Sequence, residues 1–143
     1  NHIMFEFDDT IVLSRLIEGE YFRINQMLSS DYETKVTLNR RDFMDAIDRA
    51  SILVRENDKK PLILNFTDEE MELKMDARLA ITKFGKDLMI GFNPKFLGDA
   101  LRIIDDEEVT LYMMNPKSPC FIRDEEETYI YLILPVNFNA AAI

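Results

Sequence analysis

The residue types that most often carry covalent catalysis are scarce in this chain of 143 residues. It has one histidine, His2, close to the start, and one cysteine, Cys120, inside a strand-like run where a packed thiol is expected. A Ser/His/Asp set needs an interior histidine that the fold can hold beside a serine and a carboxylate. The four glycines stand apart at positions 19, 85, 91 and 98, which excludes a glycine-rich phosphate loop. We therefore expect no catalytic residues and no cofactor.

Carboxylates, which could bind a hard cation, are abundant and gather in short runs. About half of the 27 Asp and Glu residues lie in Asp8–Asp9, Asp68–Glu72, Asp105–Glu108 and Asp124–Glu127. A calcium loop alternates its oxygen ligands around a turn glycine. None of the runs has that spacing, including Asp105–Glu108, the best of them. We interpret them as solvated turns and expect no metal site.

The net charge of −10 argues against nucleic acid as a partner of the whole chain. Because the acidic runs are local, a face away from them can still be basic. The candidate cations lie on two predicted helices and are Arg40, Arg41, Arg49 and Arg55 on the first and Lys95 and Arg102 on the second. Asp45, Asp48 and Asp99 share these faces and weaken the positive field. Taken alone, the pattern is typical of an ordinary solvated helix surface.

Two amphipathic segments would position these charges. Asn39 suits an N-cap, and from there to about residue 55 the apolar residues recur at helical spacing, namely Phe43, Ala46, Ile47, Ala50 and Val54. Asn93 suits a second N-cap with Pro94 at the first helical position, followed by the core positions Leu97, Ala100, Leu101 and Ile104. Both segments therefore predict a helix with one buried face.

The other segments are typical of strands. We expect "IMFEFDDTIVLSRLIEG" to form two strands around Asp8–Asp9, and residues 20–34 to be a connector. Further strands are expected in "TKVTL", in "PLILNFTDEEMELKMDA" as a strand-turn-strand, and in "RLAITKF" and "DLMIGF", which join near Gly85. The runs "EVTLYMM", "PCFIRD" and "TYIYLILP" complete the set.

The chain contains an internal repeat. The block "VTLNRRDFMDAIDRA" begins at Val36, and "IGFNPKFLGDALRII" follows 54 residues later, with a shared N-x-x-x-[FL]-x-D-A pattern. Each unit is a strand, a helix and about three strands, and each leaves an apolar sheet face that the other can cover. The prediction is an α+β fold, pseudo-twofold, with two helices on one face of antiparallel sheets.

Composition limits the remaining possibilities. The chain is 47% hydrophobic, which favours a folded domain over disorder. It has no run of about 18 apolar residues and no basic-then-apolar leader, so neither a membrane span nor secretion is indicated. A single cysteine fits a reducing cytosol. We expect a cytoplasmic protein with no membrane partner.

Several blocks together resemble the bacterial DNA polymerase III β subunit, the replicative sliding clamp. They are "FEFDDTIVLSRLIEGEYFRI", "FMDAIDRASILVRE", "LMIGFNPKFLGDAL" and "YIYLILPV", in the family's order and spacing over about residues 3–138. The resemblance implies a DNA-clamp fold, with residues 1–22 as closing strands of a preceding clamp domain and linker, 23–138 as the C-terminal domain and 139–143 as a tail. Two departures are a shortened connection over 76–85 and a longer C-terminal end.

The resemblance also implies function. Clamps are head-to-tail dimers of three-domain protomers that encircle duplex DNA, tether DNA polymerase III and have no chemistry of their own. The six cations above would face the DNA without reading bases. Ile52 and Leu53 would form the ring interface, although a single exposed Ile at a helix end is commonplace. The alternative to a clamp is a stand-alone peptide-binding adaptor that does not encircle DNA.

The third implied surface is a groove that binds a linear motif of the polymerase α subunit and the clamp loader. The matching positions are Phe22, Gln26, Met27, Pro119, Leu132, Leu134, Pro135, Val136 and Asn137. Phe22 and Gln26 depart from the Pro and Arg that are frequent in the family. For Leu132 and Leu134 the alternative is that both are plain core residues.

Overall fold

The structure is a computed structural model that describes residues 1–21, 23, 28, 31–53, 61–73 and 77–139. The chain divides into two compact units, residues 1–30 and 31–143. In the first unit, β1 (His2–Phe7) pairs antiparallel with β2 (Thr10–Arg15). Asp8 turns the hairpin with a positive φ of 49°, which a short polar side chain tolerates better than most. The predicted strand pair around Asp8–Asp9 is confirmed.

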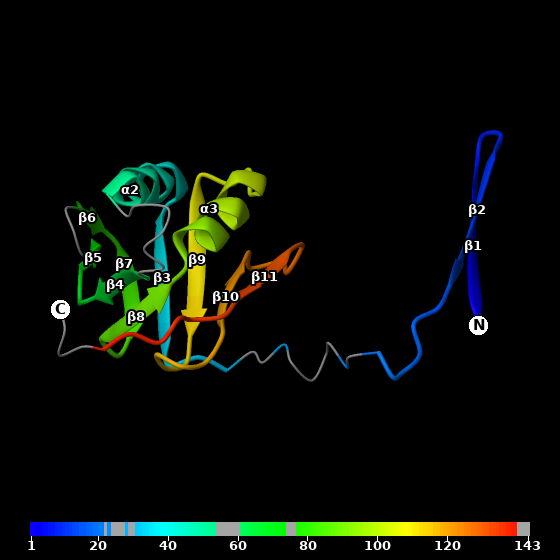
Figure 1. The fold of residues 1–143 in the computed structure, drawn as a ribbon. Coiled ribbons are helices and arrows are strands. Elements are labelled where there is room, and N and C mark those ends of the chain that lie inside the picture. Colours follow the sequence, from blue (N-terminus) through cyan, green and yellow to red (C-terminus); the bar gives the residue numbers. More distant parts are fainter. Residues whose placement is uncertain (22, 24–27, 29–30, 54–60, 74–76, 140–143) are drawn as a thin grey trace. The chain divides into compact units, whose positions relative to one another are not determined.

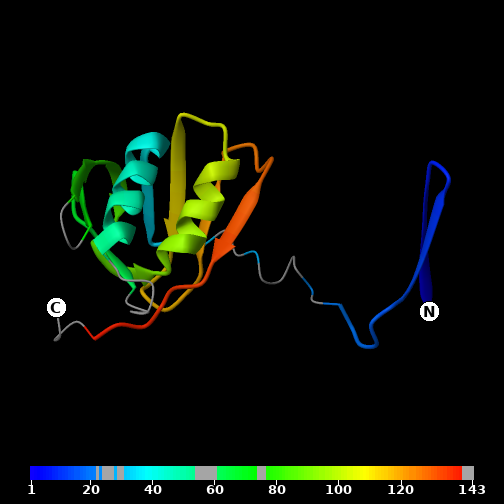
Figure 2. The ribbon, with the colours of Figure 1, turned by 45° about the horizontal axis from the view of Figure 1, so that its top comes forward.

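The second unit contains two antiparallel sheets covered on one face by two helices, as Figures 1 and 2 show. The helices are α2 (Arg40–Leu53) and α3 (Pro94–Ile103). The strands are β3 (Thr34–Asn39), β4 (Leu62–Phe66), β5 (Glu70–Leu73), β6 (Ala77–Ala80), β7 (Thr82–Gly85), β8 (Leu88–Phe92), β9 (Glu108–Met113), β10 (Cys120–Arg123) and β11 (Ile130–Ile133). The α+β fold with both helices on one face is confirmed.

The two halves exchange strands. The five-stranded sheet has the order β11-β10-β9-β3-β7, and the four-stranded sheet has the order β6-β5-β4-β8. The strand before α2, β3, therefore pairs with β9 of the second half, while the strand before α3, β8, pairs with β4 of the first half. This exchange explains why a duplicated unit folds as one body, since each sheet is complete only with a strand from the other half.

Both helices begin as the asparagines predict. Asn39 Oδ1 accepts hydrogen bonds from the backbone N–H groups of Arg41, at 3.0 Å, and Asp42, at 3.1 Å. Asn93 Oδ1 accepts from the N–H of Lys95 at 3.0 Å. These bonds satisfy N–H groups that have no partner within the first helical turn.

The core lies between the helices and the sheets. From α2 it takes Phe43, Ala46 and Ile47, and from α3 it takes Leu97, Ala100 and Leu101, all buried. Ile104, directly after α3, is buried as well, as its position in the apolar pattern predicts. Val54, the last predicted core position of the first helix, lies outside the described residues.

The run "RLAITKF", predicted as one strand, is instead divided between two sheets. Its first part is β6 in the four-stranded sheet and its second part is β7 in the five-stranded sheet, with Ile81 between them. The N–H of Ile81 donates to Glu69 O at 3.0 Å, beyond the end of the β5–β6 ladder, while the next residues pair with β3. The chain changes sheets within a single residue.

Candidate binding surfaces

The exposed charges of the two helices are balanced. Within the described helices the exposed cations are Arg41, Arg49, Lys95 and Arg102, and the exposed carboxylates are Asp42, Asp45, Asp48 and Asp99. Such a face can contact phosphates through single long side chains, but its summed field is weak compared with a basic patch. The structure places four of the six predicted cations on the exposed surface of the helices, together with four acids.

Arg102 is held between two of these carboxylates. Its Nη1 lies 3.2 Å from Asp99 Oδ1, one turn earlier on α3, and its Nη2 lies 3.3 Å from Asp48 Oδ1 on α2. All three side chains are about half exposed, at 54%, 52% and 54%. This geometry orients Arg102 along the seam between the helices and offsets its charge.

Arg40 has a different environment from the other predicted cations. Its Nε donates to Asp106 O at 2.7 Å, and its Nη1 donates to Leu101 O at 3.1 Å. Its backbone N–H donates to Glu107 O at 2.9 Å. Carbonyl groups at a helix C-terminus have no partner within the helix, so a guanidinium there caps α3. Arg40 thus links the start of α2 to the end of α3.

The end of α2 carries an apolar side chain in solvent. Ile52 is 81% exposed, as the helical pattern predicts for a residue on the side opposite Phe43. The side chain of Leu53, its predicted partner, lies outside the described part of the chain, as does Arg55.

The two leucines predicted for the groove are on the surface. Leu134 is 64% exposed and Leu132 is 36% exposed, so the alternative that both are plain core is wrong. Pro119, Pro135 and Val136 are half-buried, and Asn137 is exposed. Phe22, Gln26 and Met27 fall outside the described residues.

The segment after β11 is fixed against the other sheet. The N–H of Val136 donates to Gly91 O on β8 at 2.8 Å. A Cβ at Gly91 would lie 2.9 Å from Val136 O and 2.8 Å from Phe138 Cδ1, so a residue without a side chain is needed for this close approach. The rim of the predicted groove therefore has a defined backbone path.

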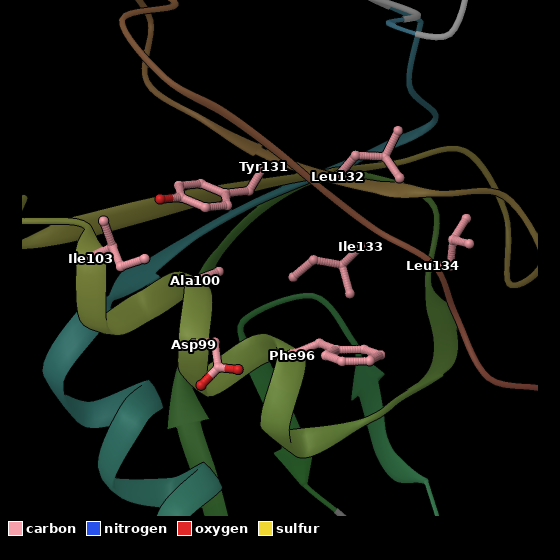
Figure 3. A pocket seen from close by; sticks show the side chains of 8 residues that line it. All are labelled: Phe96, Asp99, Ala100, Ile103, Tyr131, Leu132, Ile133 and Leu134. Carbon is pink, nitrogen blue, oxygen red and sulfur yellow. The ribbon is translucent and has the colours of Figure 1, made fainter. Parts of the chain in front are cut away.

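A hollow of about 400 Å³ lies between α3 and β11. Figure 3 shows its lining, which comprises Phe96, Asp99, Ala100, Ile103, Tyr131, Leu132, Ile133 and Leu134. Tyr131 and Ile133 face α3, whereas Leu132 points away from it, in keeping with strand alternation. The lining is apolar apart from the Asp99 carboxylate and the Tyr131 hydroxyl.

Of the eight residues that line this hollow, only Leu132 and Leu134 were predicted as site residues, and Phe96 and Ile103 are the most exposed of the apolar residues that were missed. Phe96 is 55% exposed and Ile103 is 68% exposed, although both are large and apolar. The sequence does carry a signal, because both positions fall outside the Leu97, Ala100 and Leu101 stripe of α3. Ile52 was identified in the same way, as an apolar residue outside the buried stripe of its helix.

Cys120 and Asp124, two further residues whose side chains could take part in chemistry, are held by burial or by hydrogen bonds. Cys120 is fully buried, and burial raises the pKa of its thiol well above the ordinary range. Asp124 accepts from the Thr128 hydroxyl at 2.6 Å and from the Thr128 N–H at 2.8 Å, which lowers the pKa of its carboxyl.

Within the described ranges, no three His, Cys, Asp or Glu side chains are grouped to hold a metal ion, and no helix has the length and apolar character to cross a membrane.

Comparison with known proteins matches residues 25–137 to the family described as DNA polymerase III beta subunit, C-terminal domain. The beta sliding clamp of Bacillus subtilis is 30% identical over 145 residues, covering 94% of this chain and 38% of that protein. The beta sliding clamp of Staphylococcus epidermidis is 32% identical over 146 residues, covering 95% of this chain and 39% of that protein. The chain thus spans about two fifths of the curated relatives it matches.

Solved structures agree with the sequence match. A putative DNA polymerase III beta subunit from Eubacterium rectale has a TM-score of 0.88 and 63% identity, over 98% of this chain and 40% of that one. The DNA polymerase sliding clamp from Bacillus subtilis has a TM-score of 0.83 and 28% identity, over 96% of this chain and 39% of that one. This chain belongs to the family of bacterial DNA polymerase III beta subunits, the beta sliding clamps, and matches their C-terminal domain.

Proposed function

We propose that the chain serves as the C-terminal part of a replicative sliding clamp, which encircles duplex DNA in a bacterial cytoplasm. Residues 1–22 would be the closing strands and linker of the preceding domain, residues 23–138 the clamp domain and residues 139–143 a tail. The observation that carries the proposal is the match over residues 25–137 in a fold whose two helices share one face. No bond is made or broken in this role, because a closed ring is retained on DNA by topology.

The helix face would be turned toward the DNA. Arg41, Arg49 and Lys95 would meet phosphates loosely, and the neighbouring aspartates would keep each contact weak. A clamp must translate along the duplex, so a balanced face suits it better than a strongly basic one. Arg102 would contribute less because Asp48 and Asp99 already engage it. Arg40 is left out of this set because its guanidinium caps α3.

The exposed Leu132 and Leu134, with Pro119, Pro135 and Val136, would form this domain's share of the peptide groove. An extended peptide with apolar anchors would bury these side chains, and its partners would be the polymerase α subunit and the clamp loader. Phe22, Gln26 and Met27 would complete the groove from the connector. Ile52, with Leu53, would contact the neighbouring protomer in the ring.

The test is binding of a fluorescent peptide that carries the clamp-binding motif of a replicative polymerase, measured by anisotropy on this chain. We expect saturable binding that Leu134→Ala weakens by about tenfold, roughly 1.4 kcal/mol. The urea midpoint should change little, because the Leu134 side chain is already 64% exposed. Phe84→Ala, at an equally exposed residue on β7, is the matched control. Unchanged peptide affinity in the Leu134 variant would contradict the groove.

A further inference from the structure

The exposed apolar residues around the hollow come from two elements that belong to different parts of the fold. Leu134, which is 64% exposed, directly follows β11 of the five-stranded sheet. Phe96, which is 55% exposed, lies in the first turn of α3, and α3 continues from β8 of the four-stranded sheet. Figure 3 shows the two side chains on separate walls of the hollow. The spacing of the walls therefore depends on the contact that joins the end of β11 to β8.

That contact is made at Gly91 of β8. The N–H of Val136 donates to Gly91 O at 2.8 Å. A Cβ at Gly91 would lie 2.9 Å from Val136 O and 2.8 Å from Phe138 Cδ1, and real Cβ atoms essentially never come within 3.0 Å of such neighbours. A glycine inside a strand often marks a place where another backbone approaches closely. The missing side chain is thus what allows the segment after β11 to reach β8.

Gly91 itself has little freedom to move. It pairs with Ile63 of β4, and its two neighbours in the chain, Ile90 and Phe92, are both fully buried. Side chains packed into a dense core resist displacement. A side chain added at Gly91 would therefore push away the segment that crosses it, rather than β8.

The segment after β11 is held on both sides of Leu134. Ile133, the last residue of β11, is 5% exposed and pairs with β10, and Val136 is bonded to Gly91. Of the two residues between these anchors, Pro135 has its φ fixed by its ring. A peptide that covers Leu134 therefore meets a backbone that is already ordered. Ordering even one residue on binding would lower the affinity by roughly tenfold.

We propose that Gly91 is a positioning residue for the peptide groove, which holds Val136 in place and thereby Leu134. Gly91 is buried, so it acts without touching the peptide. The proposal rests on the proposed function, because the ligand is the same extended peptide with apolar anchors. It adds that the affinity of the groove is set in part by a residue outside the groove.

The experiment measures anisotropy of the fluorescent motif peptide with the full chain, at a temperature where circular dichroism shows each variant folded. Gly91→Ala should weaken binding by at least about tenfold. Gly98→Ala is the matched control, since a Cβ at Gly98 would meet only Arg102 side-chain atoms at 3.6–3.7 Å, an ordinary contact, and it should bind as the native chain does. Phe138→Ala adds no atoms to the buried strand, and loss of the ring that packs on Gly91 should weaken binding by about threefold.

Two further measurements separate positioning from a general loss of stability. In the Leu134→Ala background, Gly91→Ala should weaken binding by less than about twofold more, because the side chain that Gly91 positions is gone. Hydrogen exchange followed by NMR should show that the Val136 N–H exchanges faster in Gly91→Ala than in the native chain. A merely structural role would lower the urea midpoint and leave the peptide affinity of the folded chain unchanged.

The possible results distinguish this proposal from the groove itself. Native affinity in Gly91→Ala, or in Phe138→Ala where Gly91→Ala does not fold, would overturn the positioning role while the groove stands. Full additivity with Leu134→Ala, or weaker binding with unchanged exchange of the Val136 N–H, would overturn it as well, since the loss would arise elsewhere. A native chain that does not bind the peptide would contradict the groove, and the positioning role with it.

Discussion

Arg102 and Asp48 are 54 positions apart, the spacing of the internal repeat, and Arg102 Nη2 lies 3.3 Å from Asp48 Oδ1. In a twofold arrangement, equivalent positions meet only near the axis. The ion pair therefore marks the pseudo-twofold axis between α2 and α3, where the repeat brings position 48 against its own counterpart. Because one of the two equivalent positions is an arginine and the other an aspartate, the contact is attractive.

This arrangement leads to a prediction about DNA contact. Replacing both partners of Arg102, by Asp48→Asn with Asp99→Asn, should raise the affinity of the chain for duplex DNA at low salt. The freed guanidinium can then contact a phosphate and release one more counterion from the DNA. A plot of the logarithm of the association constant for DNA against the logarithm of the salt concentration should therefore become steeper by about one. Anisotropy of a labelled duplex measures both quantities. Glu125→Gln with Glu126→Gln, which removes two charges outside the helices, is the control, and an equal effect there would contradict the assignment.

Arg40 and Arg41 are neighbours with different surroundings in the structure. Arg40→Gln should lower the free energy of unfolding by about 1–2 kcal/mol, since the carbonyls of Leu101 and Asp106 lose their donor. Arg41→Gln, at an exposed position, should change it by less than about 0.5 kcal/mol. Urea unfolding followed by circular dichroism compares the two variants. Equal effects would remove Arg40 from the capping role.

The buried thiol provides a probe of global stability. Cys120 is fully buried and burial raises the pKa of its thiol, so the reactive thiolate is scarce in the folded state. A thiol reagent should modify the native chain only as fast as the chain unfolds, and the urea-unfolded chain at once. Rapid modification in native buffer would show that the β10 region opens locally.

The surroundings of Lys83 lead to the prediction that the free energy of unfolding falls at high pH. Its Nζ lies 2.7 Å from Asp87 Oδ1, 3.0 Å from Gly85 O and 3.5 Å from Asp68 Oδ1. The hydrogen bond to Asp87 is the largest of the effects that raise the pKa of this amine above its ordinary 10.5. The charged amine therefore contributes its full stability below about pH 10.5 and loses it as the pH rises through the folded-state pKa.

The measurement compares urea unfolding of the native chain and Lys83→Met as the pH is raised. The difference in unfolding free energy should stay constant at neutral pH and shrink in strongly alkaline buffer. Lys86→Met controls for the loss of one positive charge, since the Lys86 side chain is 73% exposed and pairs with Glu33. A difference that grows with pH would contradict the sign of the shift.

The local sequence pattern predicted most of the helices and strands, but it did not predict which strands pair with one another. The apolar spacing and the two asparagine caps were sufficient for α2 and α3, because the forces that start and bury a helix act within a few residues. The exchange of β3 and β8 between halves, and the sheet change at Ile81, depend on contacts between distant segments. These are set when the two halves meet, and no short window of sequence contains them.

The same distinction applies to the candidate surfaces. Ile52 was predicted to be exposed because its helix position alone decides that. The capping role of Arg40 was not predicted, since its acceptors lie 61 and 66 residues away. The hollow beside Phe96 was missed for the same reason, because its walls come from α3 and β11, about 30 residues apart.

The proposed function requires that this domain complete a ring through which DNA passes. The most direct measurement replaces the C-terminal domain of the Bacillus subtilis beta sliding clamp, a relative at 30% identity, with residues 31–139 of this chain. The chimera is loaded by that organism's clamp loader, and its retention is compared on closed circular DNA and on the same DNA after linearisation. If the domain completes a closed ring, the chimera should stay on the circle for a long time and leave the linear form rapidly at equal salt. Equal loss from both forms, by a chimera that folds, would contradict it.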